Sequence, residues 1–213
     1  MTELFLSAFV TLFVVIDPLG CGPIFAGLTS GASEAHRRAM AIRSTLIASI
    51  VLILFAVVGR PFLHVLGIGL DAFRIAGGIM LFLIALEMVF EKRTQRRTER
   101  AEGVARDAAE AHRPIEQEDV SVFPMAIPMI AGPGSIATVM LMMARAHDLE
   151  QTMVVMGALL AVMLLMLLSL LGALVLMRML GARLEATISR LLGVILAALA
   201  TQFVIDGLKA SFG

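Results

Sequence analysis

The sequence predicts an all-α, polytopic membrane protein with six transmembrane helices. The chain of 213 residues is 59% hydrophobic and only 16% charged, which is more apolar than a soluble domain of this size can bury. Segments of about 20 mostly apolar residues, the length that crosses a bilayer as a helix, recur along the chain. The two halves of the sequence also share a pattern of prolines and glycines. Together these observations exclude an ordinary soluble globular protein.

The predicted spans are joined by short polar loops, except at mid-chain. The first three run from about Leu4 to Leu28, Met40 to Val58 and Leu66 to Phe90. The other three run from about Val120 to Ala144, Thr152 to Met177 and Ala186 to Leu208. Glu3, rather than a basic cluster, precedes the first span, so we expect a retained helix and not a cleavable signal.

A charged stretch divides the chain into two parts of three spans. We therefore expect a first three-helix repeat at 1–90, a cytoplasmic connector at 91–119 and a second repeat at 120–213. The connector holds eight acidic and seven basic residues, a composition that favours a solvated, partly helical or disordered segment, with regulatory docking as the alternative.

The distribution of Lys and Arg predicts the orientation. The side that holds both termini carries three of these residues, and the opposite side carries twelve. Loops rich in Lys and Arg stay in the cytoplasm. Both termini are therefore expected outside, in the periplasm or the extracellular space.

An internal repeat relates the halves. Pro18 of the first span matches Pro133 of the fourth at an offset of 115 residues, and Arg74 of the third matches Arg190 of the sixth at an offset of 116. Because each repeat has three spans, the second starts from the other side of the membrane. The two halves are then inverted about an axis in the membrane plane, and binding sites in such proteins lie near the midplane.

Helix-breaking residues interrupt the first and fourth spans about midway. A continuous helix does not accommodate such runs easily, because proline lacks a backbone donor and clashes with the preceding turn. The freed backbone groups are tolerated in a membrane only inside the protein or along a wet cavity. We therefore predict that helices 1 and 4 are discontinuous and share a cavity, with two structural kinks as the alternative.

The half-helix ends suit a small zwitterion. The carboxylate of an amino acid would accept hydrogen bonds from N–H groups near Gly20 to Gly22 or Gly134 to Ser135, and carbonyl ends or Asp17 would meet its ammonium group. Asp17 is the candidate coupling residue, although a helix cap would also explain it. Ser135 and Thr138 share a helical face and either line the site or bond back to the helix. The predicted substrate-binding residues are Asp17, Pro18, Gly20, Cys21, Gly22, Pro23, Gly132, Pro133, Gly134, Ser135 and Thr138.

Other classes of function find no support in the sequence. A net charge of zero gives no bulk attraction to nucleic acid. One cysteine and four scattered histidines exclude a disulfide framework and give no metal-ligand spacing. No phosphate loop, zincin motif or nucleophile elbow is present, so we expect neither an enzyme nor a cofactor.

In the proline- and glycine-containing segments of the first, third and fourth spans, the sequence resembles the MarC family of six-span membrane proteins, which includes SnatA-type neutral amino acid transporters. The specific matches are Asp17-Pro18-Leu19-Gly20 with Pro23-Ile24-Phe25, Ala126-Ile127-Pro128 with Ala131-Gly132-Pro133-Gly134, and Phe73-Arg74-Ile75-Ala76-Gly77-Gly78.

The resemblance implies a carrier of the bacterial inner membrane that moves small neutral amino acids such as glycine and alanine, with coupling to protons. One position departs from it, because members commonly have Asn where this chain has Cys21. The alternatives are an exporter of another small metabolite or a drug, and a non-transport signalling protein that uses the connector. The sequence leaves the oligomeric state open.

Overall fold

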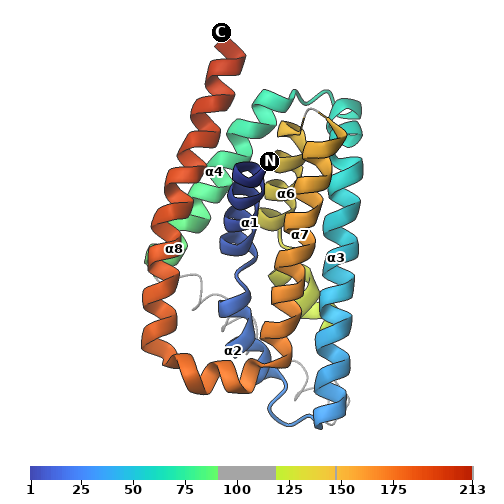
Figure 1. Cartoon of the computed structure of the whole chain (residues 1–213), viewed down its shortest axis with the longest axis vertical. Coiled ribbons are helices and arrows are strands. Elements are labelled where there is room, and N and C mark those ends of the chain that lie inside the picture. Colours follow the sequence, from blue (N-terminus) through green and yellow to red (C-terminus); the bar gives the residue numbers. More distant parts are fainter. Residues whose placement is uncertain (91–118, 147, 213) are drawn as a thin grey trace.

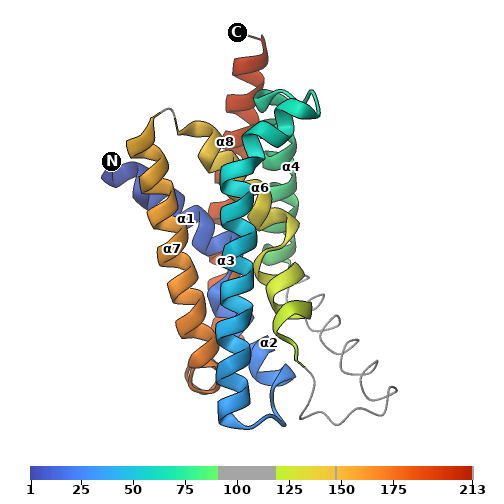
Figure 2. The same cartoon turned by 90° about the vertical axis from the view of Figure 1, so that its right-hand side faces the viewer.

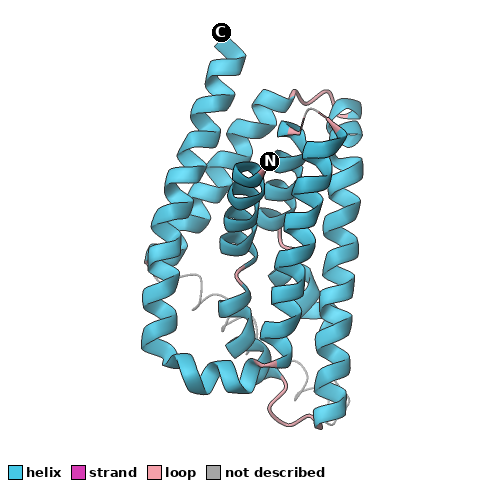
Figure 3. Ribbon diagram, in the orientation of Figure 1, coloured by secondary structure: helices cyan, strands magenta, loops and turns pink. Residues whose placement is uncertain are grey.

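The computed structural model describes residues 1–90, 119–146 and 148–212, with the side chains of 176–183 and 185 excepted, and over these residues it contains helices and loops without strands (Figure 3). Five described segments are long and apolar enough to cross a membrane, or six when the bent pair η2 and α6 is counted as one span. The elements in chain order are α1 (Thr2–Ile16), α2 (Pro18–Leu28), α3 (Glu34–Val65), α4 (Leu70–Val89), η2 (Ser121–Ile130), α6 (Pro133–Arg145), α7 (Leu149–Leu171) and α8 (Ala173–Phe212).

The helices form one elongated bundle. Both termini lie toward the same end as the α3–α4 and α6–α7 loops, which we call the termini end (Figures 1 and 2). The α2–α3 loop and the α7–α8 turn lie at the opposite end. The connector predicted at 91–119 lies outside the described residues, apart from Asp119.

One predicted boundary is wrong, at the end of α7. The fifth span was expected to reach Met177, but α7 ends at Leu171 and Gly172 follows it. The next helix begins at Ala173, crosses the opposite end of the bundle, and then turns along it (Figure 1). Its part that is long and apolar enough to cross a membrane begins at Ala186, as predicted. Hydropathy does not detect this turn because the sequence stays apolar on both sides of Gly172.

The two halves of the chain pack in corresponding ways. In the first half, α1 packs on α7, and α2 packs on both α7 and α8. In the second half, η2 packs on α3, and α6 packs on both α3 and α4. The third helices of the halves, α4 and α8, form the most extensive contact of the bundle.

Glycines bring α4 and α8 together at two reciprocal points. A Cβ on Gly78 would lie 2.9 Å from the carbonyl oxygen of Ala200 and 2.8 Å from the Val204 side chain. A Cβ on Gly193 would lie 3.1 Å from the carbonyl oxygen of Ala85. Neither position has room for a side chain, so these glycines permit close helix contact.

The outer faces are apolar. Along α3, four large side chains recur every four residues and are each more than half exposed: Ile42, Leu46, Ile50 and Leu54. This stripe is what a helix presents to lipid rather than to water.

An ion pair joins α3 to the start of η2. The guanidinium of Arg43 donates to the Asp119 carboxylate at 2.7 Å, and the Ser121 backbone N–H donates to the same carboxylate at 2.9 Å. Partial burial raises the pKa of Asp119, but the hydrogen bonding with Ser121 and the Arg43 charge outweigh it and hold this pKa below its ordinary value. The pair therefore persists at neutral pH and is lost only in acid.

Candidate functional site

The first helix interruption is built around Asp17. Its backbone is left-handed at φ 59°, an arrangement that Asp tolerates better than most residues. Its N–H donates to the carbonyl of Phe13 and closes the last turn of α1. Its carboxylate accepts a 3.1 Å hydrogen bond from the N–H of Gly20, so Asp17 caps α2, as expected from the sequence. Pro18 occupies the first position of α2, where a missing N–H costs nothing.

The second interruption separates η2 from α6. Within η2 the backbone is extended at Phe123 and Ile127. Each of them precedes a proline, whose ring disfavours helical backbone angles in the residue before it. After Ile130 the chain leaves η2, and α6 begins at Pro133. The axes of the two segments meet at 52°.

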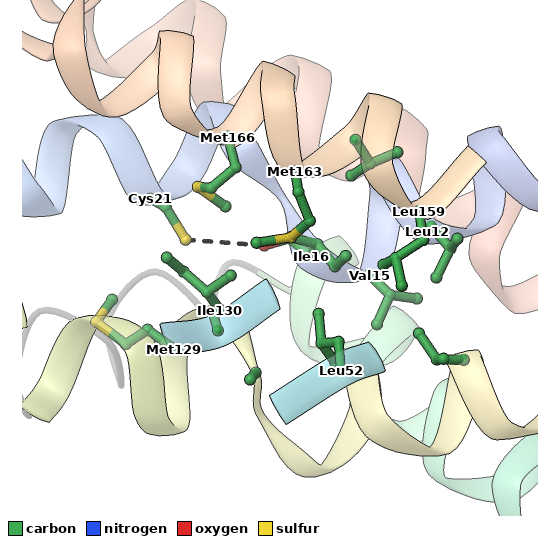
Figure 4. Packing of buried hydrophobic residues seen from close by; sticks show 14 of the residues in the cluster. Leu12, Val15, Ile16, Cys21, Leu52, Met129, Ile130, Leu159, Met163 and Met166 are labelled. Atoms are coloured by element: carbon green, nitrogen blue, oxygen red, sulfur yellow. Dashed lines mark hydrogen bonds between the residues drawn. The ribbon is translucent and has the colours of Figure 1, made fainter. Parts of the chain in front are cut away.

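The two interruptions lie side by side in the interior. A Cβ on Gly134 would be 3.7 Å from the side chain of Val15, two residues before Asp17. Ile130 lies beside Ile16 and Cys21 in Figure 4. From this meeting point α2 runs toward the opposite end and α6 toward the termini end (Figures 1 and 2). The amino-terminal ends of two oppositely directed helices, each with a positive dipole end, thus come together.

Apolar side chains occupy the space between the interruptions. Cys21 and Ile130 face Met163 and Met166 of α7 (Figure 4). The Cys21 side chain is fully buried, and its thiol lies 3.7 Å from the carbonyl oxygen of Ile16. The interruptions are therefore closed over in this conformation, and the methionines are adaptable side chains that could yield to a small ligand.

The structure buries most of the residues predicted to bind substrate. Asp17 is 8% exposed and Ser135 is 3% exposed. Pro23 is half-buried, whereas Pro133 is exposed. Thr138 donates its hydroxyl to the carbonyl of Gly134 at 2.7 Å, so this side chain bonds back to its own helix. The other predicted residues are buried: Pro18, Gly20, Cys21, Gly22, Gly132 and Gly134.

Sequence reasoning missed Ser169. Its hydroxyl, on α7, donates to the backbone carbonyl of Pro18 at the start of α2. Beside it a groove of about 300 Å³ follows α1, α2 and α7, lined by Phe13, Pro18, Leu19, Leu165, Leu168, Ser169, Gly172 and Val175. The only sequence signal was a lone hydroxyl in an apolar helix, because its partner is 151 residues away.

The described residues hold no group of three or more His, Cys, Asp or Glu side chains that could bind a metal ion. The chemistry available between the interruptions is therefore that of backbone N–H and carbonyl groups, one carboxylate, hydroxyls and a thiol. These groups can bind a small polar molecule.

The chain is similar in sequence to known membrane proteins over nearly its whole length. The model of the MarC family of integral membrane proteins matches residues 2–212. The chain is 34% identical to a UPF0056 membrane protein of Methanocaldococcus jannaschii, over 98% of each chain. It is also 34% identical to the UPF0056 membrane protein YvbG of Bacillus subtilis, over 100% of this chain and 97% of the relative. No solved structure matches the chain.

Proposed function

The chain belongs to the MarC family of integral membrane proteins, and from this premise we propose that it is a secondary transporter of small neutral amino acids such as glycine and alanine. The observation that carries this proposal is the buried meeting of the starts of α2 and α6. The N–H groups at the start of α6, which has no side-chain cap, would donate to the carboxylate of an amino acid, whereas the Gly20 N–H at the start of α2 already donates to Asp17. Asp17 and the carbonyl ends of the preceding segments would receive its ammonium group.

Transport would follow from rocking of two inverted three-helix repeats about this midplane site. The corresponding packing of the two halves supports that relationship. The close contacts of Gly78 with α8 and of Gly193 with α4 support it as well. These two glycines are 115 residues apart, the same offset as Pro18 and Pro133. Asp17, a buried carboxylate between two half-helices, would couple substrate movement to protons.

The protein would act in the inner membrane of a bacterium with both termini outside. The bundle places the termini and the α3–α4 and α6–α7 loops toward one end, in keeping with six crossings (Figure 1). The twelve-to-three distribution of Lys and Arg then assigns the termini end to the periplasm or the extracellular space.

The decisive experiment is counterflow in liposomes. Purified protein should exchange labelled glycine and alanine faster than protein-free vesicles, and Asp17→Asn should lower the exchange rate at least about tenfold, because the loss of one charged contact is worth roughly that factor. Asp148→Asn is the matched control, since Asp148 also caps a helix through its carboxylate but is exposed at the start of α7.

Three outcomes are informative. Normal exchange by Asp148→Asn with lost exchange by Asp17→Asn supports the proposed site. Equal loss in both variants would mean that helix capping, and not substrate contact, is what Asp17 provides. Absence of exchange for a panel of neutral amino acids, with folded wild-type protein, would reject amino acid transport.

A further inference from the structure

A second group of charged side chains lies toward the termini end of the bundle, away from the helix interruptions. Arg145, the last residue of α6, forms an ion pair with Asp206 of α8. Its guanidinium also lies 4.2 Å from the centre of the Phe203 ring, a distance at which the cation and the ring attract each other. These contacts fix the Arg145 head group between α6 and α8.

The start of α4 adds to the same group. A Cβ on Gly207 would be 3.1 Å from the carbonyl oxygen of Asp71 and 2.7 Å from the Ile75 side chain. Because Gly207 has no side chain, α8 approaches α4 closely at this point and carries Asp206 to the turn that bears Arg74. The guanidinium groups of Arg74 and Arg145 are near enough to repel each other.

Among the described residues this cluster comprises three arginines and two aspartates: Arg60, Arg74, Arg145, Asp71 and Asp206. Arg60 directs its guanidinium to the carbonyl of Ala144. Arg74 is 3.7 Å from the Asp71 carboxylate, too far for a hydrogen bond. The Nε–H of Arg74 is buried and has no hydrogen-bond partner among the described residues. A buried, unsatisfied donor beside a like charge is costly unless a ligand meets it.

We propose that Arg74 and Arg145 form a binding site for an oxyanion, a carboxylate or a phosphate, at the termini end of the bundle. An oxyanion between the two guanidiniums would accept from the unpaired Nε–H of Arg74 and relieve the repulsion between the heads. Arginine offers paired N–H donors in a plane that matches these groups. The side chains of Arg74 and Arg145 are 17% and 32% exposed, so a ligand can reach them. The site does not depend on the proposed transport of amino acids.

The ligand could come from two sources, a free carboxylate in solution or the phosphate of a phospholipid headgroup. Detergent-purified protein would be heated, and the folded fraction measured by size-exclusion chromatography. One arm would compare sodium acetate with sodium chloride at equal ionic strength. The other would compare phosphatidylglycerol with a diacylglycerol of the same chains, which lacks the phosphate.

We expect an oxyanion to protect the wild-type protein and Arg74→Gln to raise the half-protecting concentration about tenfold. Arg74→Lys keeps the charge without the planar fork, so an intermediate value is expected, and this variant serves if Arg74→Gln does not fold. Arg38→Gln is the matched control, because Arg38 belongs to an exposed pair with Glu34 at the other end of the bundle.

Protection by acetate that is lost in Arg74→Gln would identify a free carboxylate as ligand. Protection by phosphatidylglycerol alone, lost in the same variant, would identify a lipid phosphate. Absence of protection by either probe, or protection that Arg74→Gln leaves unchanged, would overturn the site. Protection by acetate in a folded protein that exchanges none of the panel of neutral amino acids would reject the transport function and leave the oxyanion site standing.

Discussion

At the scale of single residues, the two helix interruptions depend on Asp17, whose carboxylate caps α2, and on Gly134, which packs against Ile84. The cap on α2 by Asp17 follows from the identity of Asp17, Pro18 and Gly20, which are close neighbours in sequence. The pairing of Arg74 with Asp71, three residues apart on one helix, was predictable in the same way. The bond from Ser169 to Pro18 was not, because only the fold brings α7 to the start of α2.

Gly134 leads to the first residue-scale prediction. A Cβ at this position would lie 2.3 Å from Cδ1 of Ile84, so Gly134→Ala overpacks the contact between α6 and α4. We expect it to lower the free energy of unfolding by about 1–3 kcal/mol. Ile84→Val removes the offending methyl group and should restore most of this loss in the double variant. Titration of the purified protein with a denaturing detergent measures both effects.

Gly157 provides the control for this measurement. It lies within α7 and a Cβ there would meet nothing within 4 Å. Gly157→Ala should therefore raise stability by about 0.5–1 kcal/mol, because alanine has less backbone freedom to lose than glycine. If Gly134→Ala behaved in the same way, α4 and α6 would not be packed at Gly134 as described.

At the scale of elements, the sequence predicted which segments are helical spans better than where they end. Hydropathy found each of the membrane-length segments that the described residues contain, since a span must be apolar over about 20 residues. It placed the end of α7 too late, because the turn at Gly172 lies inside an apolar run. The start predicted at Ala186 agrees with the part of α8 that is long and apolar enough to cross a membrane. For the helix after the first interruption the sequence offered Pro18 or Pro23 as the first residue, and for the helix after the second it offered Pro133, because proline favours the first position of a helix. The structure begins these helices at Pro18 and Pro133 and places Pro23 inside α2.

The contact between α4 and α8 gives an element-scale prediction. Gly78→Ala and Gly193→Ala both place a Cβ against the backbone of the other helix, which cannot move aside as a side chain can. Each variant should lower the detergent concentration at half-unfolding, and by similar amounts, because the two contacts are reciprocal. A loss in only one variant would show that the two contacts are not equivalent.

At the scale of the whole molecule, the packing refines the internal repeat. The match of Arg74 with Arg190 gives an offset of 116, whereas the reciprocal contacts pair Gly78 with Gly193 at 115, the offset of Pro18 and Pro133. An arginine on a helix surface has few constraints on its position, whereas a glycine at a close contact has many. The 115-residue register is therefore the one that the packing favours, and only the assembled bundle distinguishes it.

The proposed orientation of the whole molecule can be tested directly. Alkaline phosphatase folds to an active form only outside the cytoplasm, so the enzyme fused after Gly213 should be active in cells. A fusion within the Lys- and Arg-rich stretch between Lys92 and Arg113 should be inactive. The reverse pattern would place both termini in the cytoplasm and invert the assignment of the two ends.

Because Cys21 is buried, the reactivity of its thiol reports how often the side chains that cover it move apart. The chain has one thiol, and it lies where the starts of α2 and α6 meet, covered by Ile130, Met163 and Met166 (Figure 4). A water-borne maleimide can alkylate it only when that cover parts, because the reagent must touch the sulfur. When the cover closes faster than the reagent reacts, the rate of alkylation in native protein is the fraction of time that the cover is open multiplied by the reaction rate of the exposed thiol. Any opening of this buried region can thus be measured without introducing a cysteine.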